Sequence, residues 1–150
     1  MKKEPIIKKM ARLTWTDYRF VAEAAFWLLY TAVLIHFLPL RWWVGSIGRE
    51  RHDENNPEDL SADEQKIIAG VRKNVFRANK VLFKPARCFG LALTIKRMLA
   101  GKGVQTSLHL GVQKDHAGNL RAHAWLMKGD AVLYGGKTAP GKFTQLVALS

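Results

Sequence analysis

Residues 87–103 read Arg-Cys-Phe-Gly-Leu-Ala-Leu-Thr-Ile-Lys-Arg-Met-Leu-Ala-Gly-Lys-Gly, and this stretch decides how the chain should fold. Its apolar residues recur at helical spacing and two glycines end the pattern, which predicts a helix from about Cys88 to Ala100. Cys88 is the only cysteine, so the chain can form no internal disulfide and no multi-cysteine zinc site. Unpaired N–H groups and the helix dipole favour the thiolate form of a thiol at a helix N-terminus. The stretch therefore predicts a nucleophilic cysteine at the start of a core helix.

Alternating apolar residues after this helix predict strands over residues 104–112, 120–127 and 131–134, followed by a short element over 143–148. His123 lies on the second strand and shares a face with Trp125. If that strand packs under the helix, His123 can meet Cys88. An imidazole within about 3–4 Å of a thiol can act as its base and then protonate a leaving amine.

The residues before the cysteine helix predict further helices. Ser61 and Glu64 form a capping box, so a helix should begin at Ala62 and run to about Asn79. Residues 48–60 are polar and predict a linker between an N-terminal helical region, residues 1–50, and a core domain, residues 60–150. The expected fold class is α+β, with helices first and an antiparallel meander after them.

Residues 21–40 are almost entirely apolar and about long enough to span a membrane. We interpret them as a long buried or interfacial helix that Pro39 ends, with membrane-surface contact through residues 21–43 as an alternative. Spanning is disfavoured because the basic N-terminal flank would stay inside and place Cys88 in an oxidising compartment. The expected location is therefore the cytoplasm, with association at the membrane surface as the alternative.

The net charge of +12 is unevenly distributed along the chain. Seven of the twelve acidic residues lie between residues 50 and 64, whereas fifteen Lys and Arg face only two Asp after residue 65. Such a field attracts anions in general, including nucleic acid, anionic lipid and acidic peptides. A non-catalytic basic module that binds nucleic acid or anionic membrane is therefore one alternative function, although no nucleic-acid motif is present.

The run from Arg87 to Val104, then Leu110-Gly111-Val112, then Ala122-His123-Ala124-Trp125-Leu126, resembles the transglutaminase-like cysteine protease of lasso-peptide biosynthesis. The resemblance covers roughly residues 60–150 and implies a papain/transglutaminase-like core of the stand-alone form. It implies a bacterial peptidase that removes the leader from a ribosomally made precursor peptide and needs no cofactor. The implied partners are a PqqD-like leader-recognition protein and an asparagine-synthetase-like, ATP-dependent cyclase. Cys88 matches the family's nucleophile and His123 its base.

The third catalytic residue departs from the family pattern, which has an acid about a dozen residues after the histidine. Tyr134-Gly135-Gly136 stands there instead, and the only acid after His123 is Asp130, in a turn. We assign Asp130 as the residue that orients His123, with a backbone carbonyl as the alternative. Transglutaminase-like acyl transfer by the same Cys-His pair is the alternative reaction.

Overall fold

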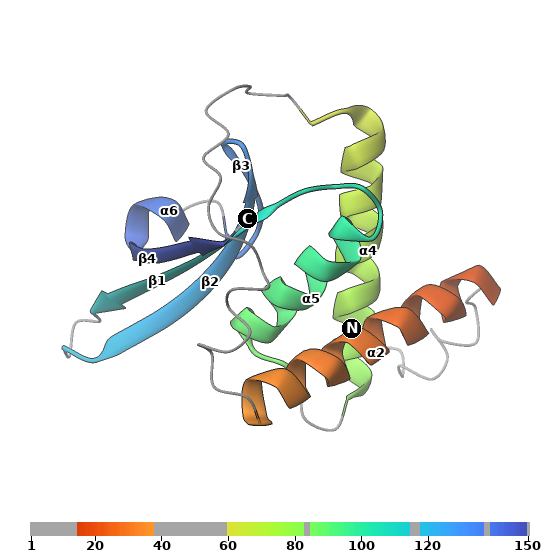
Figure 1. Ribbon diagram of the computed structural model, residues 1–150, viewed down its shortest axis with the longest axis horizontal. Helices are drawn as coiled ribbons and strands as arrows, with labels where there is room; N and C mark the ends of the chain where they lie inside the picture. Colours follow the sequence, from red (N-terminus) through yellow and green to blue (C-terminus); the bar gives the residue numbers. More distant parts are fainter. Residues whose placement is uncertain (1–14, 38–59, 83–84, 115–117, 137–138, 150) are drawn as a thin grey trace, which may run out of the picture.

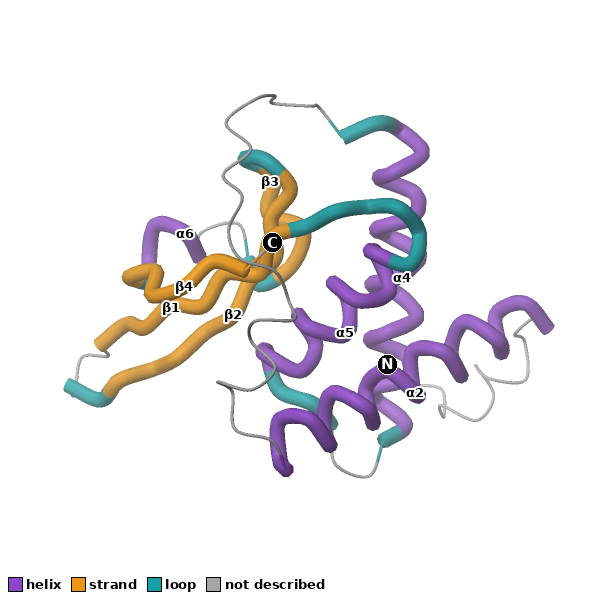
Figure 2. Tube along the Cα trace, viewed as in Figure 1, coloured by secondary structure: helices purple, strands orange, loops and turns teal. Residues whose placement is uncertain are grey.

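The computed structural model describes residues 15–37, 60–82, 85–114, 118–136 and 139–149 (Figures 1 and 2). Its elements are α2 (Trp15–Phe37), α4 (Ala62–Val81), α5 (Cys88–Ala100), β1 (Ser107–Lys114), β2 (Leu120–Lys128), β3 (Ala131–Tyr134), α6 (Ala139–Lys142) and β4 (Thr144–Leu149). The predicted α+β class, helices followed by an antiparallel sheet, is confirmed. The predicted stop at Pro39 and the linker up to residue 59 lie outside the described residues.

The four strands form one sheet in the order β3-β2-β1-β4, and each neighbouring pair is antiparallel. β1 begins three residues later than expected, because the Val104 N–H donates to the Leu99 carbonyl and closes the end of α5. The sheet is also not a simple meander. β4 pairs with β1 rather than with β3, so the segment containing α6 carries the chain to the opposite edge.

Helix α5 lies between the sheet and the other two long helices, as Figure 1 shows, while α6 lies away from them beside β4. From Gly90 to Leu99 every residue of α5 except Arg97 is buried. Ala124 and Leu126 of β2 belong to the same apolar core as these helix residues. Because α5 is apolar on nearly all sides, it is stable only when other parts of the protein cover all of these sides.

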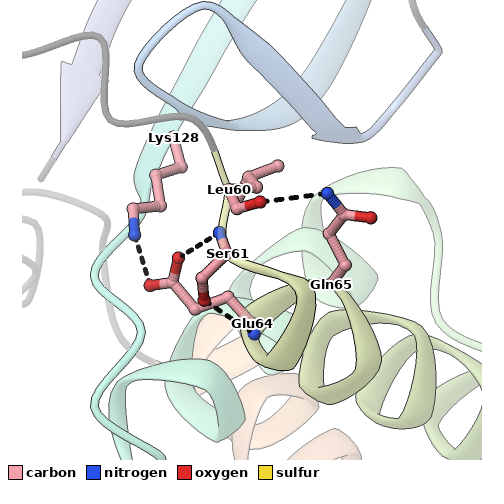
Figure 3. A network of polar contacts seen from close by, with 5 residues as sticks. All are labelled: Leu60, Ser61, Glu64, Gln65 and Lys128. Carbon is pink, nitrogen blue, oxygen red and sulfur yellow. Dashed lines mark hydrogen bonds and ion pairs between the residues drawn. The ribbon is translucent and has the colours of Figure 1, made fainter.

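The N-terminus of α4 is attached to β2 by a polar network (Figure 3). The predicted capping box is present, with reciprocal hydrogen bonds of 3.2 Å between Ser61 and Glu64. The Glu64 carboxylate also pairs with the Lys128 ammonium, and this contact, followed by the Ser61 backbone bond, lowers the pKa of Glu64. Gln65 donates to the Leu60 carbonyl and completes the network.

Helix α2 packs on α4 and α5 along one side only. Ala24, Leu28 and Thr31 are buried there, and the Thr31 hydroxyl is 3.1 Å from the hydroxyl of Thr94 in α5. Only 17% of the apolar window Tyr18–Phe37 is buried. The expectation of a buried helix therefore holds for one side of α2, and the opposite side is open.

Lys96 gives the fold a testable pH dependence. Its ammonium donates to the Thr106 carbonyl at the end of a largely buried side chain. Burial, and then the nearby charge of Arg97, lower the pKa of Lys96 from 10.5 to about 8. Between these values the unfolded state binds more protons than the folded state, so the contribution of Lys96 to stability rises with pH.

We expect the free energy of unfolding of the wild type to rise relative to that of Lys96→Met as the pH increases from 8 to 10.5. Urea unfolding of both proteins at several pH values in this window measures the difference. If the free energies of unfolding of the two proteins changed in parallel with pH, this result would contradict the proposed burial of the charged ammonium.

Candidate active site

Cys88 is the first residue of α5, where the helix emerges from the core. Arg87 precedes it in extended conformation and provides no side-chain cap, and the first turn holds no acidic residue. The Leu91 N–H donates to the Arg87 carbonyl at 3.0 Å and closes the first turn of the helix. The N-terminus of a helix favours a negative charge through its backbone N–H groups and the helix dipole. The Cys88 side chain is half-buried, so a substrate can reach it.

Tyr134, the last residue of β3, is within electrostatic range of Cys88 and was not singled out from the sequence. Burial, and then the charge of Cys88, raise the pKa of Tyr134 to about 12, while Arg72 opposes the shift. Its ring lies 6.0 Å from that of Phe76, centroid to centroid. At neutral pH the phenol therefore keeps its proton, and its hydroxyl can donate a hydrogen bond. No local sequence pattern links Tyr134 to Cys88, because the two residues are brought near each other only by the position of the β2–β3 hairpin.

His123 is held by a backbone carbonyl. Its Nε2 lies 2.7 Å from the carbonyl oxygen of Gly135. Because a carbonyl only accepts hydrogen bonds, Nε2 carries the proton in the neutral ring and Nδ1 keeps its lone pair. His123 therefore has the tautomer in which Nδ1 is available as a base.

The His123 ring also belongs to an aromatic stack on the same face of the sheet. It stacks on Phe143 at 4.9 Å and on Trp125 at 6.4 Å, between ring centroids. Trp125 is fully buried and stacks on its other side against His109 at 5.7 Å. His109 has both ring nitrogens 3.0 Å from polar side chains, those of Ser107 and Gln145. The stack restrains the plane of the His123 imidazole.

The structure does not place Cys88 and His123 together in the way expected. The face of β2 that packs toward α5 carries Ala124 and Leu126, whereas His123 points to the other face. The two residues are connected through the end of β3, where Tyr134 is within electrostatic range of Cys88 and the Gly135 carbonyl contacts His123. Within the part of the chain that the structure describes, no hydrogen bond joins Cys88 to His123. Such contacts are often loose before substrate binds.

Asp130 lies away from His123. It is exposed in the turn between β2 and β3, and the stretch of β2 from His123 to Lys128 alone spans roughly 16 Å. The structure therefore does not support Asp130 as the orienting residue, and the contact expected of it is made by Gly135. The carbonyl alternative from the sequence fits this geometry.

No metal site accompanies these residues in the described ranges, where no group of three or more His, Cys, Asp or Glu side chains could hold an ion. The chemistry available in this region is that of the thiol, the imidazole, the phenol and the N–H groups of the α5 N-terminus.

A family model described as the transglutaminase-like superfamily matches residues 31–148, from the last turns of α2 to β4. This match covers well over half of the 150 residues, and the chain belongs to the transglutaminase-like superfamily. Members of this superfamily are in general cysteine peptidases or acyltransferases. No significant match was found among curated proteins or among solved structures.

Gly135 provides a direct test of the support for His123. Its φ is +100°, and an added Cβ would lie 2.4 Å from the Trp125 Cβ and 2.8 Å from the Ala124 carbonyl oxygen. We expect Gly135→Ala to lower the free energy of unfolding by about 3–5 kcal/mol, because backbone strain and a steric clash add together. Equilibrium urea unfolding measures this loss.

The matched control is Gly136→Ala. Gly136 has a similar φ of +95° but nothing within 4 Å of an added Cβ. This variant should lose only the strain of a left-handed residue, about 1–2 kcal/mol. Equal losses at the two positions would show that Gly135 does not pack tightly on β2.

Proposed function

We propose that the protein is a cysteine endopeptidase that removes the leader from a ribosomally made lasso-peptide precursor, with Cys88 as nucleophile and His123 as base. The observation that carries the proposal is Cys88 at the N-terminus of α5, which has no side-chain cap, in a helix that packs on the strand β2 that carries His123. Membership of the transglutaminase-like superfamily supports the chemistry. The choice of substrate rests on the resemblance of residues 87–104 and 122–126 to the lasso-peptide protease.

In this proposal the Cys88 sulfur attacks the scissile carbonyl while Nδ1 of His123 takes the thiol proton. The oxyanion of the tetrahedral intermediate accepts hydrogen bonds from the N–H groups of the α5 N-terminus and from the Tyr134 hydroxyl. His123 then protonates the leaving amine, which departs and leaves a thioester on Cys88. Water adds to the thioester, His123 takes its proton, and the acid product leaves as the thiol re-forms.

The partner that orients His123 affects the rate of this cycle. A carboxylate in that place would stabilise the imidazolium by a full charge, whereas the Gly135 carbonyl offers only a dipole. The carbonyl fixes the tautomer and the ring position but adds less to the stability of the charged intermediate. We therefore expect a turnover lower than that of an otherwise similar enzyme with an acidic third residue.

Two partners belong to the proposal, a PqqD-like protein that presents the leader and an asparagine-synthetase-like, ATP-dependent cyclase that closes the ring. Both follow from the resemblance. The excess of positive charge after residue 65 supports docking of acidic leader or partner surfaces, since opposite potentials steer association. The proposed location is the cytoplasm.

Acyl transfer is the alternative reaction, because the superfamily includes acyltransferases that use the same kind of thioester chemistry. In that reaction an amine replaces water in the second step. The masses of the products separate the two: hydrolysis adds one water to the cleaved peptide, whereas transfer adds the amine.

The proposal is tested by incubating the purified protein and a leader-binding PqqD-like protein with a lasso precursor peptide, and measuring product masses. Wild type should release the leader, whereas Cys88→Ala and His123→Asn should lose at least about a thousandfold in rate. Asp130→Asn is the control and should keep wild-type activity, because this residue is exposed in a turn. Cleavage by Cys88→Ala would refute the assigned nucleophile, and loss in Asp130→Asn would restore that residue to the site.

The contribution of Tyr134 is tested by Tyr134→Phe, which removes the hydroxyl and keeps the ring beside Phe76. We expect kcat to fall by about 10²-fold with little change in KM, because the lost donor acts on the transition state. Tyr30→Phe, at an exposed position of α2, is the matched control and should leave both constants unchanged. Equal kcat values for the two variants would exclude Tyr134 from the oxyanion site.

A further inference from the structure

The open side of α2 is mostly apolar, with Arg19 as a charged residue on the same side by helical spacing. Its large side chains lie three, four or eight residues apart and are exposed, among them Trp15 at 80%, Phe26 at 61% and Phe37 at 75%. Tyr18, Leu29 and Val33 fall on the same side by helical spacing. We call these six residues the α2 stripe. It lies opposite Ala24, Leu28 and Thr31, which are buried against α4 and α5.

A helix at a water-exposed surface normally carries charged residues on its outer side. From residue 24 to residue 35, α2 contains no charged residue at all. Apolar surface gathered in this way marks a site of contact with a membrane or with another protein, because leaving it in water is unfavourable. The α2 stripe therefore requires an apolar occupant.

Cations lie along one flank of α2 and indicate the nature of that occupant. The Lys102 ammonium lies 4.8 Å from the Phe20 ring centroid, and the Arg97 guanidinium carbon lies 6.0 Å from that of Trp27. Lys66, whose side chain is 79% exposed, lines with Phe20 and Lys102 a cavity of about 190 Å³ between the helices. Helices that bind at anionic membrane surfaces are typically rich in aromatic side chains with Lys and Arg beside them.

Two other occupants fit less well. A second copy of the chain would bring together two molecules of net charge +12, which repel each other. A membrane-spanning α2 has sufficient length, but it would have to leave α4 and α5 and lose the buried bond between Thr31 and Thr94. A helix that lies in the plane of the membrane surface keeps all of these contacts.

We propose that α2 docks this protein on an anionic bilayer, with the α2 stripe inserted at the level of the headgroups and Lys102, Arg97 and Lys66 against lipid phosphates. The apolar side chains supply binding energy, and the cations supply preference for anionic lipid. This surface is separate from Cys88 and His123, so the proposal does not depend on peptidase activity.

The test is flotation of the purified full chain with unilamellar vesicles, either of phosphatidylcholine alone or of equal parts phosphatidylcholine and phosphatidylglycerol. Wild type should float with the anionic vesicles and remain unbound with the neutral ones. The double variant Phe26→Ser/Leu29→Ser should lower the partition coefficient at least tenfold, since each side chain loses most of its transfer energy. Both positions are exposed, so far-ultraviolet circular dichroism should show an unchanged fold.

The matched control is Leu120→Ser/Leu146→Ser, which removes two exposed apolar side chains, 68% and 62% accessible, from the sheet. This variant should bind like wild type. Lys102→Glu should weaken binding to anionic vesicles by at least fivefold, because charge near the surface contributes to binding.

Three results would overturn the proposal. The first is failure of the wild type to float with anionic vesicles, or equal flotation of the Phe26/Leu29 double variant and the wild type. The second is a dimer in sedimentation velocity that this double variant abolishes, which would make a second copy the occupant. The third is retention of the protein in the cell-membrane fraction after carbonate extraction, which would mean that α2 spans the bilayer.

Discussion

The burial of α5 on all sides is the constraint on which the rest of the structure depends. A helix that is apolar around nearly its whole circumference needs the sheet on one side and α2 and α4 on the others. The exception inside this helix, Lys96, reaches the Thr106 carbonyl with its ammonium while its aliphatic stem stays in the core. Cys88 is the residue at which this buried helix first becomes partly exposed.

Strand β2 divides the molecule into two environments. Its Ala124 and Leu126 belong to the core under α5, whereas Trp125 is enclosed on the other face between His109 and His123. Gly135 connects the two environments, because its positive φ lets the chain pass directly over Trp125 while its carbonyl faces His123. The candidate site therefore lies at the end of β3, where the chain passes from one face to the other.

Local signals made part of this fold predictable. The bounds of α5, the capping box at Ser61 and the strand over 131–134 were predicted from patterns within a few residues, and the structure confirms them. Two features depend on how distant segments pair: the position of β4 beside β1, and the face of the sheet on which the His123 side chain lies. Apolar alternation within one strand does not specify them. The contact of Gly135 with His123 joins two segments twelve residues apart, and no local pattern predicts it.

The sequence did not predict which side of α2 is buried, and the physical reason is a different one. Helical periodicity separates a buried face from an exposed one only when the two differ in polarity, and α2 is apolar on both. The structure separates them by contact: Ala24, Leu28 and Thr31 are buried against the protein, whereas Trp15, Phe26 and Phe37 are exposed on the opposite side. One apolar side packed on protein and a second apolar side left exposed are the arrangement expected of a helix that contacts protein on one side and the boundary of a bilayer on the other.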